Sequence, residues 1–122
     1  MPGVARFGRV LDAIVHKLPN ARILEVGAGS GAATDQLMKI LAPEGMPARF
    51  GTFDYTDVEP GFFDAAQEKY RHHGTKMRFT KLDVEAAPED QGFEAGTYDV
   101  VVAAAVSLSQ LVARLWPSIS GL

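Results

Sequence analysis

Two kinds of hydrophobic pattern alternate along the chain. In residues 4–18 the apolar positions recur every three or four residues, which is typical of one buried face of a helix. After Pro19, residues 22–26 form a short, mostly apolar run that stops at a cluster of glycines. A second helical pattern occupies residues 32–41. These segments predict a helix, a buried strand, a tight glycine turn and another helix.

The alternation of strands and helices continues beyond this point. Residues 49–58 predict a strand with an acidic end, residues 60–70 a helix, and residues 77–82 a third strand. The almost wholly apolar run at 98–106 predicts a fourth strand, central in the sheet and covered on both faces. Strands that alternate with helices pair in parallel, so we expect an α/β fold with an open, Rossmann-like parallel sheet.

Length and composition fit a single domain of this kind. The chain has 122 residues, 47% of them apolar and 22% charged, which suits one globular core. A net charge of -3 gives no basic field for a phosphate backbone, so we expect no nucleic-acid partner. The chain has no cysteine for disulfides or thiolate metal sites, and we predict no metal. No apolar run approaches the roughly 20 residues of a membrane span, so we expect a cytoplasmic protein.

The glycine cluster is the first candidate for chemistry. Gly27, Ala28, Gly29 and Gly31 lie between the first strand and the next helix. Glycine allows the backbone to come close to a ligand because it has no Cβ, so a nucleotide-like cofactor is expected at this turn. Residues 27–32 also satisfy the G-x-G-x-x-G/A pattern of dinucleotide binders. The pattern alone therefore does not distinguish a dinucleotide from another nucleotide-like cofactor.

An acidic residue before the turn favours one of these cofactors. Glu25 lies two residues before Gly27, at the end of an otherwise apolar strand, where a carboxylate is costly to bury without a partner. S-adenosylmethionine offers an ammonium and a sulfonium as positively charged partners, whereas a pyrophosphate would be repelled by the carboxylate. Glu25 therefore favours S-adenosylmethionine over NAD or NADP.

Acidic residues also follow the second and third strands. Asp57 can accept hydrogen bonds from both hydroxyls of a ribose, and Asp54 competes with it for this role. Asp83 is placed to accept a hydrogen bond from an adenine amino group. Val58 and Val84 are predicted to contact the cofactor next to these aspartates. In an open α/β sheet all these strand ends line one crevice, where ligands bind.

The sequence of these segments resembles that of the C-methyltransferase domain of fungal reducing polyketide synthases, a class I methyltransferase. The resemblance covers roughly residues 22–106. It rests on ILEVGAGSG at 23–31, on YTD at 55–57 followed by PGFFDAA, and on LDVE at 82–85 with GTYDV further along. It implies methyl transfer from S-adenosylmethionine to the α-carbon of a β-ketoacyl chain held on an acyl carrier protein, in polyketide biosynthesis.

The chain departs from that family in two respects. Family members carry a histidine shortly after the fourth strand as the expected base, whereas residues 104–109 contain none, so the catalytic residues are not assigned. We further expect residues 1–122 to be the amino-terminal half of the domain, truncated after the fourth strand, with a divergent tail at 107–122. An incomplete sheet has an unpaired edge, which predicts self-association. A non-catalytic remnant that binds S-adenosylmethionine and a fragment of an NAD(P)-binding oxidoreductase are the alternatives.

Overall fold

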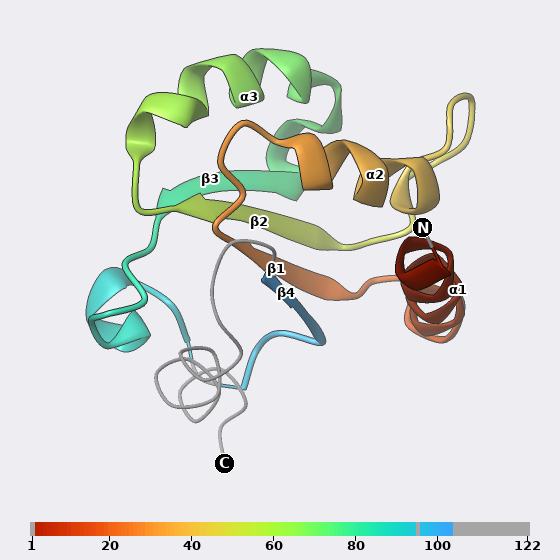
Figure 1. Ribbon diagram of the computed structural model, residues 1–122, viewed down its shortest axis with the longest axis horizontal. Helices are drawn as coiled ribbons and strands as arrows, with labels where there is room; N and C mark the ends of the chain where they lie inside the picture. Colours follow the sequence, from red (N-terminus) through yellow and green to blue (C-terminus); the bar gives the residue numbers. More distant parts are fainter. Residues whose placement is uncertain (1, 95, 104–122) are drawn as a thin grey trace.

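The computed structural model describes residues 2–94 and 96–103 and contains one four-stranded sheet (Figure 1). Its strands are β1 (Arg22–Val26), β2 (Thr52–Asp57), β3 (Met77–Lys81) and β4 (Val100–Ala103). They lie in the order β3-β2-β1-β4, and every neighbouring pair is parallel. The expected α/β fold with an open, Rossmann-like parallel sheet is confirmed.

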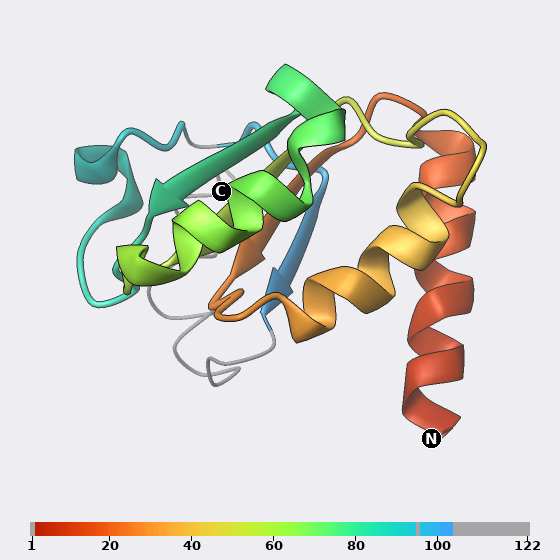
Figure 2. The ribbon, with the colours of Figure 1, turned by 90° about the horizontal axis from the view of Figure 1, so that it is seen from above.

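Three α-helices cover one face of this sheet, and the described residues also form three short 3-10 helices. They are α1 (Pro2–Lys17), α2 (Ala32–Leu41) and α3 (Phe63–Lys69), together with the short 3-10 helices η1 (Pro60–Phe62), η2 (Arg71–Lys76) and η3 (Pro88–Gln91). Figures 1 and 2 show α2 and α3 on the same side of the strands, with α1 beside the end of α2. The chain between β3 and β4 passes on the opposite side of the sheet (Figure 1). The predicted helices at residues 4–18 and 32–41 are confirmed within a few residues.

The sheet separates two hydrophobic clusters. On the helix side, Ile23 and Phe53 are fully buried among apolar side chains of α1 and α2 such as Leu11 and Leu41. On the other side, Leu24 and Val26 pack with Leu82, Phe93, Tyr98 and Val101. Because neighbouring residues of a strand point to opposite faces and both faces are covered, four of the five residues of β1 are buried. This strand anchors the glycine turn that follows it.

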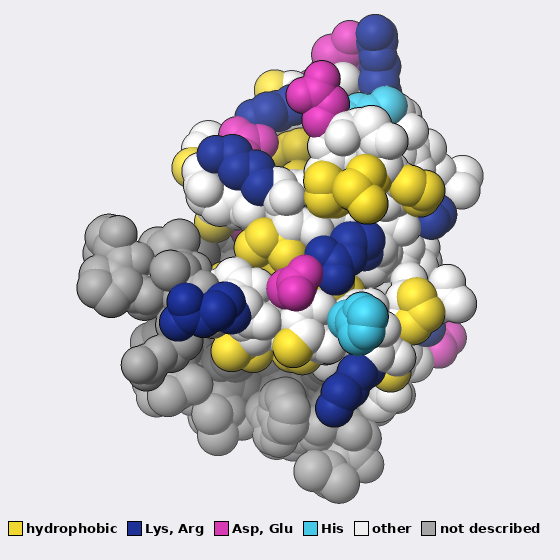
Figure 3. All heavy atoms as spheres, turned by 90° about the vertical axis from the view of Figure 1, so that its right-hand side faces the viewer, with side chains coloured by type: hydrophobic (Ala, Val, Ile, Leu, Met, Phe, Trp, Pro, Cys, Tyr) yellow, Lys and Arg dark blue, Asp and Glu magenta, His cyan; other side chains and the backbone are white. Residues whose placement is uncertain are grey.

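The outer surface of α1 is less well covered. Phe7 and Val10, with Leu18 just after the helix, are exposed large apolar side chains, whereas Leu11 and Val15 of the same helix are buried. Figure 3, which views the molecule from this side, shows hydrophobic side chains interspersed with charged ones. None of the helices in the described ranges is long and apolar enough to cross a membrane.

Two expectations about the strands need correction. The second strand begins at Thr52 rather than at residue 49. The fourth strand is not central in the described part of the sheet, where it lies at the edge next to β1, and its four residues are only half-buried. The hydrophobicity of a segment predicts that the strand is buried, but it does not predict the position of the strand in the sheet. The expected helical tail at residues 107–115 lies outside the described residues.

Candidate functional site

The turn between β1 and α2 is built from glycines in left-handed conformations. Gly29 has a φ of 57° and Gly31 a φ of 92°, values that other residues adopt only with strain. A Cβ at Gly31 would also lie 3.2 Å from the hydroxyl oxygen of Tyr55. Gly31 is thus required by backbone conformation and by the packing of the helix start against β2.

Three backbone amides of this turn donate hydrogen bonds to acceptors within the protein. Ala28 donates its N–H to the carbonyl of Thr56 over 2.9 Å, and Gly31 donates to the carbonyl of Ala28 over 3.0 Å. The Gly29 amide donates to Oδ2 of Asp57 over 2.8 Å. A loop that binds a pyrophosphate needs amides directed at the ligand. The inward direction of these three amides argues against a phosphate cradle at this turn.

Glu25 lies beneath the turn, on the helix side of the sheet. It is fully buried, and its Oε1 accepts a hydrogen bond from the hydroxyl of Thr34 in α2. Its Oε2 is buried without a hydrogen-bond partner. Burial raises the pKa of Glu25 to about 7, while the hydrogen bond from Thr34 opposes this shift. A buried carboxylate with an unsatisfied oxygen is suited to a cationic partner.

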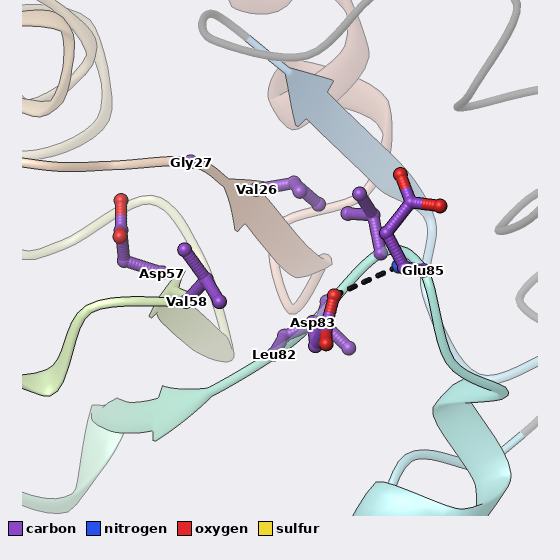
Figure 4. A pocket seen from close by; sticks show the side chains of 8 residues that line it. Val26, Gly27, Asp57, Val58, Leu82, Asp83 and Glu85 are labelled. Atoms are coloured by element: carbon purple, nitrogen blue, oxygen red, sulfur yellow. Dashed lines mark hydrogen bonds between the residues drawn. The ribbon is translucent and has the colours of Figure 1, made fainter.

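A pocket of about 420 Å³ opens at the carboxyl ends of β1, β2 and β3. Figure 4 shows Asp57 and Val58 on one side of it, and Asp83 and Glu85 on the opposite side. The apolar side chains of Val26, Leu82 and Val84 complete the lining with Gly27. The carboxyl ends of parallel strands are where ligands bind in open α/β sheets.

The two aspartates of the pocket are held by backbone amides. Oδ1 of Asp57 accepts from the amide of Glu59 over 2.8 Å, while its Oδ2 accepts from Gly29, so this carboxylate connects the loops after β1 and β2. Oδ1 of Asp83 accepts from the amide of Glu85 over 2.9 Å. Each carboxylate oxygen has two lone pairs, so both side chains retain acceptor capacity for a ligand.

The predicted cofactor-binding residues fall into two groups. Those that line the pocket are Gly27, Asp57, Val58, Asp83 and Val84. The others, which are Glu25, Ala28, Gly29 and Gly31, form the turn or lie beneath it and are not part of that lining. The two groups are adjacent, because the Gly29 amide donates a hydrogen bond to Asp57 at the carboxyl end of β2.

The competing candidate Asp54 has a different role. Its carboxylate accepts two hydrogen bonds from the guanidinium of Arg78, over 3.0 and 2.7 Å, and another from the hydroxyl of Tyr98. It is absent from the lining of the pocket and faces the side of the sheet opposite Glu25. Asp54 is three residues before the end of β2, so its side chain points to the other face from Asp57.

Sequence reasoning overlooked several residues of the site. Val26, Leu82 and Glu85 line the pocket, the hydroxyl of Thr34 donates to Glu25, and the hydroxyl of Tyr55 donates to the carbonyl of Gly29. The apolar residue immediately before each strand-end glycine or aspartate was the available signal for Val26 and Leu82. For Tyr55 the signal was its spacing of two residues from Asp57, which places both on one face of β2.

Together, the open parallel sheet, the glycine turn and the polar strand ends define a Rossmann-like domain with a site for a nucleotide-like cofactor. Residues 24–114 match a family model described as methyltransferase domain. The chain therefore belongs to the methyltransferase domain family.

The sequence relatives narrow this assignment. The chain is 48% identical over 94 residues to the highly reducing polyketide synthase azaB of Aspergillus niger, and 47% identical over 91 residues to a squalestatin tetraketide synthase of Phoma sp.. In each case the match covers 75% of this chain and only 4% of the relative. The chain thus corresponds to a small part of these synthases, namely the methyltransferase domain.

Solved structures agree with the sequence relatives. The trans-methyltransferase CalH, crystallised as a complex with SAH, is 35% identical, with a TM-score of 0.74 over 80% of this chain and 27% of that one. The CMeT domain of the citrinin polyketide synthase is 26% identical, with a TM-score of 0.54 over 69% of this chain and 21% of that one. The expected resemblance to C-methyltransferase domains of polyketide synthases is confirmed.

Proposed function

We propose that this chain binds S-adenosylmethionine at the carboxyl ends of β1, β2 and β3 and provides the cofactor site of a C-methyltransferase. The observation that carries the proposal is the buried Glu25 carboxylate, whose Oε2 has no hydrogen-bond partner and which lies beneath a glycine turn. The cofactor is positively charged at its ammonium and sulfonium, and either charge can compensate this carboxylate, directly or through water.

The remaining polar residues suit the other parts of the same cofactor. Asp57 would accept hydrogen bonds from the ribose hydroxyls, and Asp83 from the amino group of the adenine, because both carboxylates retain acceptor capacity. Val26, Leu82 and Val84 give an apolar surface against which a flat adenine can pack. The inward-directed amides of the turn favour this cofactor over a pyrophosphate-containing NAD or NADP.

When bound, S-adenosylmethionine supplies an electrophilic methyl group on its positively charged sulfur. The residues of this chain then bind and orient it, and the reaction gains chiefly from positioning, because the transfer requires no covalent bond to the protein. The chain's three histidines are absent from the pocket lining, so we assign no base.

We propose the α-carbon of a carrier-bound β-ketoacyl chain as the methyl acceptor. The support is the similarity to polyketide synthases and to the CMeT domain of the citrinin polyketide synthase. The acyl carrier protein is the corresponding partner. The competing proposal, a remnant that binds the cofactor without transferring its methyl group, shares the site and differs only in turnover.

Titration calorimetry of the full chain with S-adenosylmethionine, with NADP in parallel, tests the cofactor. The proposal expects saturable binding of S-adenosylmethionine alone, abolished by Gly29→Val, because a side chain at a φ of 57° strains the turn that receives the ligand. Unfolding curves of the variant show whether it remains folded. Binding of NADP instead, or of neither ligand to a folded chain, contradicts the proposal.

Transfer of a labelled methyl group to a β-ketoacyl thioester tests the reaction. Label in the thioester supports an active C-methyltransferase. A chain that binds the cofactor and transfers no label is the non-catalytic remnant instead.

A further inference from the structure

Gly29 is held on both sides by side chains of one strand. Its amide donates to Oδ2 of Asp57 over 2.8 Å, and its carbonyl accepts from the hydroxyl of Tyr55 over 2.5 Å. Tyr55 and Asp57 are two residues apart in β2 and therefore point to the same face of the sheet. The middle of the glycine turn is thus held by one donor, Tyr55, and one acceptor, Asp57, which both belong to β2.

Tyr55 is itself held firmly. It is fully buried, and its ring packs edge-on against Phe63 at 6.3 Å and in tilted contacts against Tyr70 at 6.4 Å and Phe79 at 5.4 Å. Burial raises the pKa of Tyr55 to about 12, so the hydroxyl remains protonated and able to donate at neutral pH. The hydrogen bond to Gly29 therefore starts from a side chain with little freedom to move.

The turn also fits closely around the hydroxyl of Tyr55. A Cβ added to Gly31 would lie only 3.2 Å from that oxygen. Glycines have wide conformational freedom, and a turn with three of them has to be ordered by its surroundings before or during ligand binding. A contact that orders the turn in advance lowers the cost of binding.

We propose that Tyr55 is a positioning residue for the cofactor: its hydroxyl holds the Gly29 carbonyl and fixes the glycine turn in the shape that receives S-adenosylmethionine. This inference rests on the function proposed above. Phenylalanine at this position would keep the ring packing and remove only the hydrogen bond. The turn would then remain in place but sample more conformations, and part of the binding free energy would be used to order it.

The chain offers a matched control in Tyr70. This residue is also a buried tyrosine on the helix side of the sheet, and its hydroxyl donates to Asp35 in α2 rather than to the turn. Tyr55→Phe and Tyr70→Phe each remove one hydroxyl and one hydrogen bond from the same hydrophobic cluster. Similar losses of thermal stability are therefore expected from both variants.

Calorimetric affinity for S-adenosylmethionine, measured on both full-length variants well below their unfolding temperatures, separates positioning from packing. Tyr55→Phe is expected to weaken binding about fivefold to tenfold, as for the loss of one hydrogen bond, and Tyr70→Phe less than twofold. An unchanged affinity in Tyr55→Phe, or equal losses in the two variants, overturns the inference.

Hydrogen exchange at the Gly29 amide provides a readout that needs no ligand. In the cofactor-free chain it is expected to accelerate about fivefold or more in Tyr55→Phe and to stay unchanged in Tyr70→Phe. Unchanged exchange in Tyr55→Phe overturns the claim that the hydroxyl orders the turn. A wild-type chain that binds no S-adenosylmethionine, with exchange behaving as expected, overturns the proposed function instead.

Discussion

Glu25 and Asp54 are almost fully buried carboxylates on opposite faces of the sheet, and their surroundings differ. Asp54, 1% exposed, faces the side away from the helices and accepts hydrogen bonds from the Arg78 guanidinium and the Tyr98 hydroxyl. Glu25, 0% exposed, faces the helices, accepts one hydrogen bond from Thr34 and leaves one oxygen unsatisfied. The charge of Asp54 is compensated by the guanidinium of Arg78, whereas Glu25 has only the hydrogen bond from Thr34 among the described residues.

The contrast follows from the side chains that surround each carboxylate. Arg78 and Tyr98 both donate hydrogen bonds to Asp54, and Arg22 stacks over the ring of Tyr98 at 5.6 Å. The hydrogen bond with Asp54 raises the pKa of Arg78, which keeps the guanidinium protonated. At Glu25 the pKa is raised because burial has no nearby cation to offset it.

Glu25→Gln is expected to have the largest effect. Affinity for S-adenosylmethionine should fall about a hundredfold in calorimetry, equivalent to roughly 3 kcal/mol, because a buried charge that the cationic cofactor compensates is lost. The cofactor-free chain should nevertheless become more stable at pH 8, by about 2 kcal/mol in urea unfolding, because a neutral amide is cheaper to bury than an unpaired carboxylate. Undiminished affinity in this variant would show that Glu25 is not a cofactor ligand.

Asp54→Ala is expected to produce the opposite pattern. The free energy of unfolding should fall by about 2 kcal/mol, since the buried pair loses its acidic partner while Arg78, which is half-exposed, recovers part of its hydration. Affinity for S-adenosylmethionine should change less than twofold, because Asp54 is not part of the pocket lining. A large loss of affinity at full stability would place Asp54 in the cofactor site after all.

The affinity for S-adenosylmethionine should depend on pH through Glu25. With its pKa near 7 in the free chain, Glu25 is mostly protonated at pH 6, and the cationic cofactor binds the ionised form. Affinity should therefore rise about eightfold from pH 6 to pH 7.5, in proportion to the ionised fraction of Glu25. Glu25→Gln should abolish this slope and Asp54→Asn should retain it. A slope that survives in Glu25→Gln assigns the titration to another group.

The raised pKa of Glu25 also makes folding stability depend on pH. Stability of the cofactor-free chain falls as the pH rises, whereas affinity for the cofactor increases. A carboxyl group whose pKa is higher in the folded than in the unfolded chain favours folding below pH 4.5, and this contribution is lost as the pH rises through about 7. Glu25 thus stabilises the cofactor-free chain at low pH and destabilises it near neutrality, where the cofactor would compensate the charge.

Thr34→Val is expected to have the smallest effect. It removes the hydrogen bond to Glu25 while keeping the size of the side chain, so the pKa of Glu25 should rise further. Affinity for S-adenosylmethionine at pH 7 should fall about threefold, and Thr34→Ser, which retains the hydroxyl, should restore it. Equal affinities for the Val and Ser variants would show that Thr34 contributes only packing.

Local patterns were sufficient to predict most of the fold. The bounds of β1 and α2 agree with the predicted segments at 22–26 and 32–41, because strand and helix periodicity and the glycine punctuation are properties of neighbouring residues. Burial of Glu25 also follows from its place in an apolar strand. The strand order and the position of β4 next to β1 depend on pairing between distant segments, and the periodicity gives no information about that pairing.

The sequence by itself determined the glycine turn, the acidic strand ends and the similarity to polyketide C-methyltransferase domains, because all of these are written in short contiguous segments. Only the tertiary structure decided which carboxylate is compensated. Asp54 and Asp57 are three residues apart, yet one meets Arg78 from β3 and the other meets Gly29 from the turn after β1. The partner of a buried charge depends on which side of the sheet the side chain faces and on which distant segment packs there.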